Sequence, residues 1–443
     1  MLSAGVQMRQ HLEDAAETRP FPKVLIIHWQ VISRMITEAV NDMPTSTLNC
    51  IVYVPNIYNG TGNTQTLIWM VEHFKNAGTD TIVCFERSWQ FPKRVPSVNL
   101  FPMYLRWLPG RLTSLVPHWL IRRRFIRLLS KYSPDNTYVY VWPPTRLKVV
   151  DDVKSLGFCV FREMINCSLR VHDAEVSLAR KNAGLEECIV ASAQMMQDEE
   201  TQLQMCDFVT APNPEVKRSL QRINIPDDKI IPTSFGWAME RFPLITSASE
   251  NFSCSQASVK KTCTVLFVGS LEARKGVYYL LEAWKNFPLQ ARLLLVGQIS
   301  SELAPLIAGA IAEGSVEHLP FVSDVESIYR AADIFVFPTV EEGGPQVTFE
   351  AAGCGLPVIT TAMGAAGIIE DGRNGLIIPS HDVHSLLTAL LDLIKNEAKR
   401  RVFGNQAQID ARSFTYDKVG ASRADLFRKK FMEFRELKMR KPV

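Results

Sequence analysis

From residue 262 onward, short apolar runs alternate with segments of helical periodicity, and this alternation constrains the fold more than any other feature. The helical segments include residues 276–287 and 301–312 and an amphipathic stretch at roughly 381–397. Short runs that are apolar at nearly every position are typical of strands buried on both faces. We expect such strands at 262–270, 291–298, 333–339 and 375–380. Strands that alternate with helices predict a doubly wound parallel sheet.

The first half of the chain repeats this pattern. Strands are expected at 50–56, 79–85, 137–143, 157–163, 206–213 and 229–236, with helices at 66–78 and 214–223. The fold class is therefore α/β, with two Rossmann-like doubly wound parallel-sheet domains facing a cleft, where ligands bind at the carboxyl ends of the strands. Gly60 and Gly62 follow the first strand and predict an acceptor or phosphate loop.

The length of 443 residues also favours two domains. We expect an N-terminal extension at 1–48 that adds a helix, a first domain at 49–245 and a second at 262–415. Residues 246–261 are Ser-rich and polar, which is typical of a linker. Residues 416–443 are expected to form a C-terminal helix.

The nine cysteines are scattered, with none closer to another than eight residues. This spacing argues against a zinc site and indicates free thiols in a reducing compartment. The N-terminus does not resemble a signal peptide, and no run of about 18 apolar residues occurs. A cytoplasmic location is therefore expected.

Two turns carry the chemistry that we expect in the cleft. "GSLEARKG" (269–276) follows a strand and precedes a helix. Its free backbone N–H groups, with Ser270, Arg274 and Lys275, suit a phosphate. A solvated turn with two incidental basic residues is the alternative interpretation.

The second turn lies in "EEGGPQVTFEAAGCG" (341–355). Gly343 and Gly344 allow the backbone to approach a ligand closely. Pro345 suits the first helical position, so that the amides of Gln346 and Val347 face the cleft.

Glu342 and Glu350 add two carboxylates to this second turn. Glu350 lies one helical turn further on, where it can accept hydrogen bonds from a ribose diol. Glu342 can accept hydrogen bonds from sugar hydroxyls. The alternative interpretation is a pair of surface acids, Glu341 and Glu342, with one satisfied buried glutamate.

These residues resemble the retaining nucleotide-sugar glycosyltransferases of the GT-B fold, specifically glycosyltransferase family 4 (glycosyl transferases group 1). The resemblance rests on "GSLEARKG", the Glu-x7-Glu pair, "EAAGCGLPVITT" and "EDGRNGLIIPSHD". It covers residues 195–400 well and 50–85 loosely. It implies that Lys275 neutralises the donor diphosphate, Glu350 holds the ribose and Glu342 binds the sugar, and that the C-terminal helix crosses back to the first domain.

The sequence departs from the family pattern at three positions. The family usually has Arg where Ser270 stands, and Arg274 is the candidate substitute. The family's EGFG loop is Glu342-Gly343-Gly344-Pro345 here. The family's cleft histidine has no equivalent near "VWPPT" (141–145), and His172 is more simply interpreted as structural.

The resemblance implies a retaining enzyme that moves a sugar from a nucleotide-diphosphate sugar to a glycan or lipid-linked acceptor, in polysaccharide biosynthesis. No Asp-x-Asp motif occurs, so we expect metal independence and no cofactor. Two alternatives keep nucleotide binding without transfer to an acceptor. They are a catalytically silent subunit and a nucleotide-sugar epimerase.

Residues 106–131 combine many arginines with aromatic residues, and no Asp or Glu occurs between Arg87 and Pro134. Trp119 and the run Arg122, Arg123 and Arg124 predict a cationic surface helix. Such a helix docks on an anionic membrane at its inner face, or it is a solvated arginine face over a packed leucine face. Nucleic acid is not expected as a partner, because no stacking platform accompanies the charge.

Overall fold

The structure, a computed structural model, describes residues 47–88, 90–101, 116–186, 189–242, 262–285, 287, 290–314, 316–322 and 324–440. The helix expected within residues 1–48 and the linker expected at 246–261 lie outside the described residues.

The first half of the chain forms a seven-stranded sheet in the order β3-β2-β1-β4-β5-β6-β7. Its strands are β1 (Leu48–Tyr58), β2 (Thr79–Ser88), β3 (Ser97–Asn99), β4 (Thr137–Val141), β5 (Cys159–Arg162), β6 (Phe208–Ala211) and β7 (Ile230–Pro232). Every ladder is parallel. Alternate residues of β1 enter two cores, with Val52 on one face and Ile51 on the other. The sheet is therefore covered on both faces, which explains its apolar strands.

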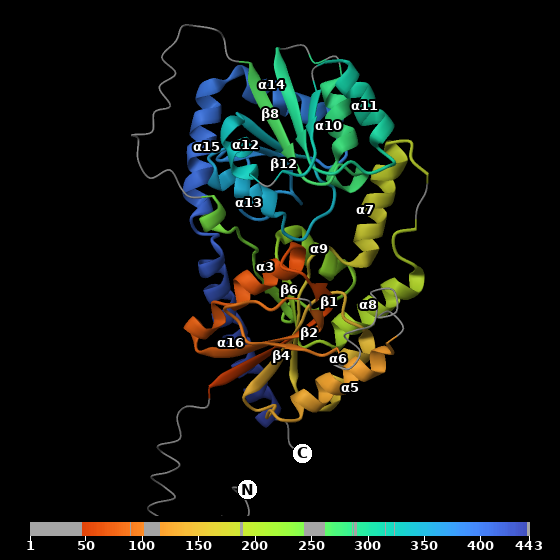
Figure 1. The fold of residues 1–443 in the computed structure, drawn as a ribbon, viewed down its shortest axis with the longest axis vertical. Coiled ribbons are helices and arrows are strands. Elements are labelled where there is room, and N and C mark those ends of the chain that lie inside the picture. Colours follow the sequence, from red (N-terminus) through yellow and green to blue (C-terminus); the bar gives the residue numbers. More distant parts are fainter. Residues whose placement is uncertain are drawn as a thin grey trace, which may run out of the picture. The chain divides into compact units, whose positions relative to one another are not determined.

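The helices of this half connect successive parallel strands and lie on both faces of the sheet (Figure 1). They are α3 (Gly62–Val71), η1 (Phe74–Ala77), α5 (His118–Leu129), α6 (Leu147–Ser155), α7 (Leu169–Asn182), α8 (Ala193–Met205), α9 (Pro214–Arg222) and η3 (Met239–Arg241).

The second half forms a six-stranded parallel sheet in the order β10-β9-β8-β11-β12-β13. The strands are β8 (Cys263–Val268), β9 (Ala291–Val296), β10 (Val316–Leu319), β11 (Ile334–Phe337), β12 (Val358–Thr361) and β13 (Gly375–Ile378). The helices are η4 (Ala273–Lys275), α10 (Val277–Trp284), α11 (Ala304–Ala312), α12 (Val325–Ala331), α13 (Gln346–Gly353), α14 (Val383–Lys395) and α15 (Glu397–Ala411).

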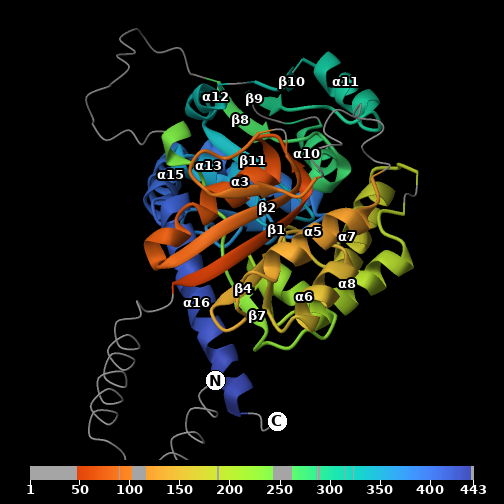
Figure 2. The same cartoon turned by 60° about the horizontal axis from the view of Figure 1, so that its bottom comes forward.

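The last helix, α16 (Tyr416–Arg440), lies beside α3 and the first sheet in both views (Figures 1 and 2). Phe427 stacks on Phe161 of β5 with ring centroids 4.4 Å apart. Arg423 is 1% exposed and pairs with Glu163, which follows β5. A helix that follows the second sheet thus completes the core of the first.

The predicted fold class is confirmed, because both halves form parallel α/β sheets. Element bounds differ in places. The helix expected at 66–78 begins earlier, at Gly62, and gives way to the turn η1 after Val71. The strand expected at 229–236 covers only Ile230–Pro232, because its partner β6 ends at Ala211, which pairs with Pro232. All seven cysteines within the described residues are free thiols.

Candidate active site

A pocket lies between the two sheets, where side chains from both halves of the chain meet. The first half contributes Asn63, Thr66, Trp142, Ile165, Asn166 and Phe235, and the second contributes Arg274, Lys275, Glu342, Gly344 and Gln346. Trp142 follows β4 directly and Glu342 follows β11 closely, so the pocket lies at the carboxyl ends of the strands. This is where open parallel sheets bind ligands.

The basic turn expected at 269–276 brings two cations to this pocket. Ala273–Lys275 form a short 3-10 turn, and α10 begins only after Gly276. Gly276 has φ +73°, and a Cβ there would lie 1.9 Å from the carbonyl oxygen of Pro338, so glycine is required. The turn therefore lies between β8 and α10, as the sequence predicted.

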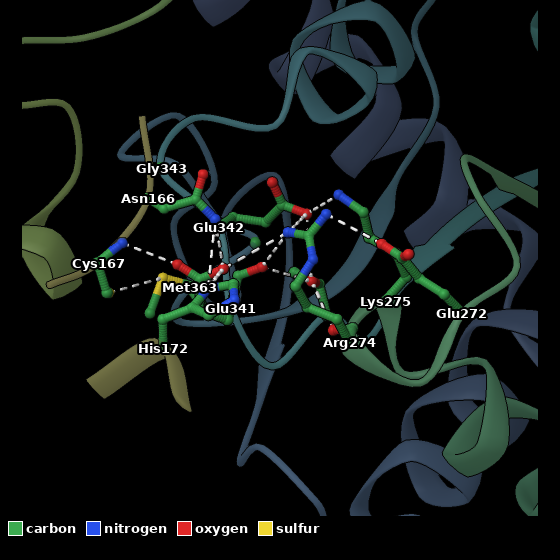
Figure 3. A network of polar contacts seen from close by, with 12 residues as sticks. Asn166, Cys167, His172, Glu272, Arg274, Lys275, Glu341, Glu342, Gly343 and Met363 are labelled. Atoms are coloured by element: carbon green, nitrogen blue, oxygen red, sulfur yellow. Dashed lines mark hydrogen bonds and ion pairs between the residues drawn. The ribbon is translucent and has the colours of Figure 1, made fainter. Parts of the chain in front are cut away.

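Lys275 and Arg274 both contact acids of the neighbouring loop (Figure 3). The Lys275 ammonium donates to Glu342 Oε1. Arg274 Nη1 lies 3.3 Å from the same oxygen and 2.9 Å from the Glu341 carbonyl. Burial opposes the charge of Arg274, but Glu342 and Glu341 raise its pKa above the ordinary value. Arg274 therefore stays charged, and it shares with Lys275 one carboxylate that faces the pocket.

The glycines of the loop after β11 pack against the first half of the chain. A Cβ on Gly343 would lie 2.1 Å from the carbonyl oxygen of Ile165, and one on Gly344 would lie 2.2 Å from the Phe235 ring. Both glycines therefore allow close contact with the first half of the chain, and Gly344 also lines the pocket, so the approach of a ligand to this loop stays a prediction. Pro345 precedes α13 as its N-cap rather than occupying the first helical position.

The first turn of α13 contacts the first half of the chain through one side chain. Gln346 lines the pocket and its amide donates to Thr66 of α3. Val347 is partly buried against the core, and its carbonyl lies 3.5 Å from the Tyr329 hydroxyl.

Glu350 is 8% exposed and has polar partners of its own. It accepts a hydrogen bond from the Tyr329 hydroxyl at 3.2 Å, and Arg241 Nη1 lies 3.8 Å away. Burial raises the pKa of Glu350, against the opposing charge of Arg241 and the Tyr329 hydrogen bond. Glu350 is not among the residues that line the pocket just described, so its role toward a ribose stays a prediction.

Glu341, the residue before Glu342, is the functional candidate that sequence reasoning missed. The alternative interpretation makes it half of a surface acid pair, but it is 0% exposed. Its carboxylate accepts from Asn166 Nδ2 at 2.6 Å, from the Cys167 N–H at 2.8 Å and from His172 Nδ1 at 2.7 Å. Burial opposes ionisation, yet His172 and Arg274 lower the pKa of Glu341 below its ordinary value.

Three further predicted site residues lie around the pocket rather than in it. Ser270 is exposed after β8. Gly60 and Gly62 both have positive φ, at +81° and +65°, and Gly62 begins α3. This loop therefore places Asn63 and Thr66 in the pocket, although neither glycine lines it.

The basic segment is described only from residue 116, and α5 carries its charges. Ile121, Phe125 and Leu129 are buried at spacings of four, so the apolar face of α5 packs into the core. Arg122 pairs with Asp152 at 3.3 Å. Arg123 and Arg124 are exposed, and Trp119 is 53% exposed. No helix in the described ranges is long and apolar enough to cross a bilayer.

Comparisons with known proteins find similarity to glycosyltransferases. Residues 262–396 match the family model of Glycosyl transferases group 1. O-antigen chain mannosyltransferase B of Escherichia coli is 26% identical over 208 residues, which are 45% of this chain and 54% of the relative. The chain spans about half the length of the curated relatives that it matches.

Solved structures share this two-sheet fold. Sucrose-phosphate synthase from Thermosynechococcus elongatus has a TM-score of 0.65 at 18% identity and covers 87% of this chain and 100% of its own. HepE from Anabaena, in complex with UDP and glucose, has a TM-score of 0.62 at 16% identity, covering 86% of this chain and 100% of its own. The chain adopts the GT-B fold, and its second half carries a domain that matches Glycosyl transferases group 1.

Proposed function

We propose that this protein is a retaining glycosyltransferase that moves a sugar from a nucleotide-diphosphate sugar to a glycan or lipid-linked acceptor. The pairing of Lys275 and Arg274 with Glu342, at the carboxyl ends of two facing parallel sheets, is the observation that carries the proposal. A diphosphate supplies the anionic charge that this cation pair is built to bind. The family match of residues 262–396 points the same way.

The two cations stabilise the charge that grows as the diphosphate leaves. When the donor binds, its phosphates replace Glu342 as the partner of Lys275. The released Glu342 carboxylate then accepts hydrogen bonds from hydroxyls of the sugar. Because Lys275 and Arg274 neutralise the diphosphate, the transfer needs no metal clamp.

Retention follows if the acceptor attacks on the face from which the diphosphate leaves. The leaving phosphate oxygen takes the acceptor's proton, so no protein base is required. The cleft then contributes positioning and charge stabilisation.

Polysaccharide biosynthesis is the proposed setting, supported by the E. coli relative that is named as an O-antigen chain mannosyltransferase. The protein acts in the cytoplasm, and the exposed Arg123 and Arg124 of α5 attract it to an anionic membrane surface that carries a lipid-linked acceptor.

Calorimetry against UDP-, GDP- and ADP-sugars, followed by assays of nucleotide release, tests the proposal. Lys275→Ala should lower turnover by about 100-fold or more while weakening donor binding far less, because its charge acts mainly in the transition state. Lys148→Ala, which removes an exposed lysine on α6, is the control. Binding without nucleotide release would identify a silent subunit, and conversion of the sugar without an acceptor would identify an epimerase. Absence of binding to every nucleotide sugar would refute the proposal.

A further inference from the structure

A second cavity, of about 650 Å³, adjoins the pocket between the sheets. It lies in the first half of the chain, between the ends of β4 and β5 and helices α7 and α8. Its volume is within the roughly 300–1,000 Å³ that small-molecule sites occupy. Apolar side chains, among them Leu147, Met164 and Met195, share its walls with charged and polar ones. A sugar has apolar C–H faces and hydroxyl edges, and this mixed lining suits it.

Asn166 stands at the junction, because it lines both this cavity and the pocket between the sheets. The orientation of the Asn166 side-chain amide follows from the group that it contacts. Glu341 is buried with a lowered pKa, so it is an acceptor-only carboxylate. The NH₂ group of Asn166 must therefore face Glu341, as Figure 3 shows. The carboxamide oxygen is then turned to the opposite side, where it can accept a hydrogen bond.

His172 of α7 is oriented by the same carboxylate. Its Nδ1 lies 2.7 Å from Glu341 Oε2, which requires a proton on Nδ1. Nε2 is the ring nitrogen that this contact leaves free. His172 lines the 650 Å³ cavity but is not among the residues that line the pocket between the sheets.

We propose that Glu341 orients Asn166 and His172 so that the Asn166 carboxamide oxygen and His172 Nε2 bind a hydroxyl group of a carbohydrate acceptor in this cavity. The proposal rests on the proposed function and adds a place and two binding residues for the acceptor. Glu341 is a positioning residue, because it acts through the other two. It also joins the acceptor cavity to Glu342, the next residue along the chain, which faces the donor.

Two substitutions of His172 separate its contact with Glu341 from the contact with an acceptor. In His172→Asn the side-chain amide can still donate to Glu341, in the place of Nδ1, while the Nε2 position is lost. In His172→Gln the amide reaches the Nε2 position and the Nδ1 contact is lost. Asn166→Ala removes the carboxamide. Asn182→Ala is the matched control, because Asn182 of α7 also bonds across the two halves, to Tyr279 at 3.0 Å, but lines neither cavity.

The assay measures release of the nucleoside diphosphate from the nucleotide sugar that binds in the calorimetric screen, with octyl glycosides of glucose, galactose and mannose as acceptors. We expect Asn166→Ala and His172→Asn to raise the KM for the glycoside about 3- to 10-fold, the scale of a lost hydrogen bond. The Kd for the donor should stay within about twofold of the wild-type value, which is less than the change expected for a lost hydrogen bond. His172→Gln should retain more transfer than His172→Asn, and Asn182→Ala should match wild type.

Three outcomes decide the proposal. If Asn166→Ala weakens binding of the nucleotide sugar but not of the free nucleoside diphosphate, the hydroxyl belongs to the transferred sugar and the acceptor assignment is overturned. Wild-type KM values in both Asn166→Ala and His172→Asn would also overturn it, as would glycosides that never raise nucleotide release above hydrolysis. If the wild-type protein binds no nucleotide sugar, the proposed function itself is refuted. That result is obtained on the wild type in the calorimetric screen, so it is distinct from a failure of the acceptor assignment.

Discussion

Replacing Gly343 with alanine should break the contact between the loop after β11 and the first half of the chain. Gly343 has an ordinary backbone conformation, so the added methyl acts by volume alone. Its Cβ would lie 2.1 Å from the Ile165 carbonyl oxygen, and the backbone must retreat by about 1.3 Å before that contact becomes ordinary. The same retreat carries Asn166 and Cys167 out of hydrogen-bonding range of Glu341, which they now contact at 2.6 and 2.8 Å.

The free-energy cost follows from those two hydrogen bonds. Each bond to a charged group contributes about 1.5–3 kcal/mol, so their loss costs about 3–6 kcal/mol. At about 1.4 kcal/mol per factor of ten, the equilibrium constant for forming this contact should fall by about 100-fold or more.

Hydrogen exchange measures this directly, because the Cys167 N–H donates to Glu341. We expect faster exchange in residues 165–168 and lower turnover in Gly343→Ala, with affinity for the free nucleoside diphosphate largely kept. Gly309→Ala is the control, since a Cβ there meets nothing within 4 Å. Wild-type exchange and turnover in Gly343→Ala would refute the reasoning.

Three further predictions concern other parts of the molecule. Arg423→Met should lower the free energy of unfolding in urea by about 3–5 kcal/mol, because it leaves the buried Glu163 side chain without its cationic partner, and adding Glu163→Gln should recover part of that loss. Glu341 has a pKa below its ordinary 4.5 in the folded protein, so its contribution to stability is present above pH 4.5 and is lost as the pH falls further. The difference in the free energy of unfolding between wild type and Glu341→Gln should therefore disappear in that acidic range. A difference that grows there would contradict this sign. Arg123→Gln with Arg124→Gln should remove about 2 kcal/mol of attraction to acidic vesicles, a loss that sedimentation should no longer detect near 1 M salt.

The sequence predicted the sheets because their strands are buried on both faces. A run that is apolar at nearly every position, such as "TVLFV", is typical of such a strand. It also predicted which turns meet, since Lys275 and Glu342 both follow strands that end at the same edge. It did not predict the role of Glu341. That residue differs from Glu342 only in its partners, and Asn166 lies 175 residues away in sequence. Local pattern carries no information on which of two adjacent buried acids contacts the first half of the chain.

The orientation of α5 shows the same limit. Its alternation of arginine and apolar residues fits a helix on a membrane and a helix on a protein core equally well. The burial of Phe125 assigns its apolar stripe to the core. A pattern thus specifies that a helix is two-faced, and only packing specifies what covers the apolar face.

The return of α16 to the first sheet determines how this chain can be divided. Cutting at residues 246–261 would produce an N-terminal fragment that lacks Phe427 and Phe431, although both rings pack against Tyr138 of β4. That fragment would expose aromatic surface and aggregate, while the other fragment would carry an unsupported helix with the unpaired Arg423. Fragment complementation therefore requires a peptide spanning residues 416–440, supplied in trans or fused ahead of residue 48. A circular permutant with that fusion would be the natural way to obtain the first half as an independent protein.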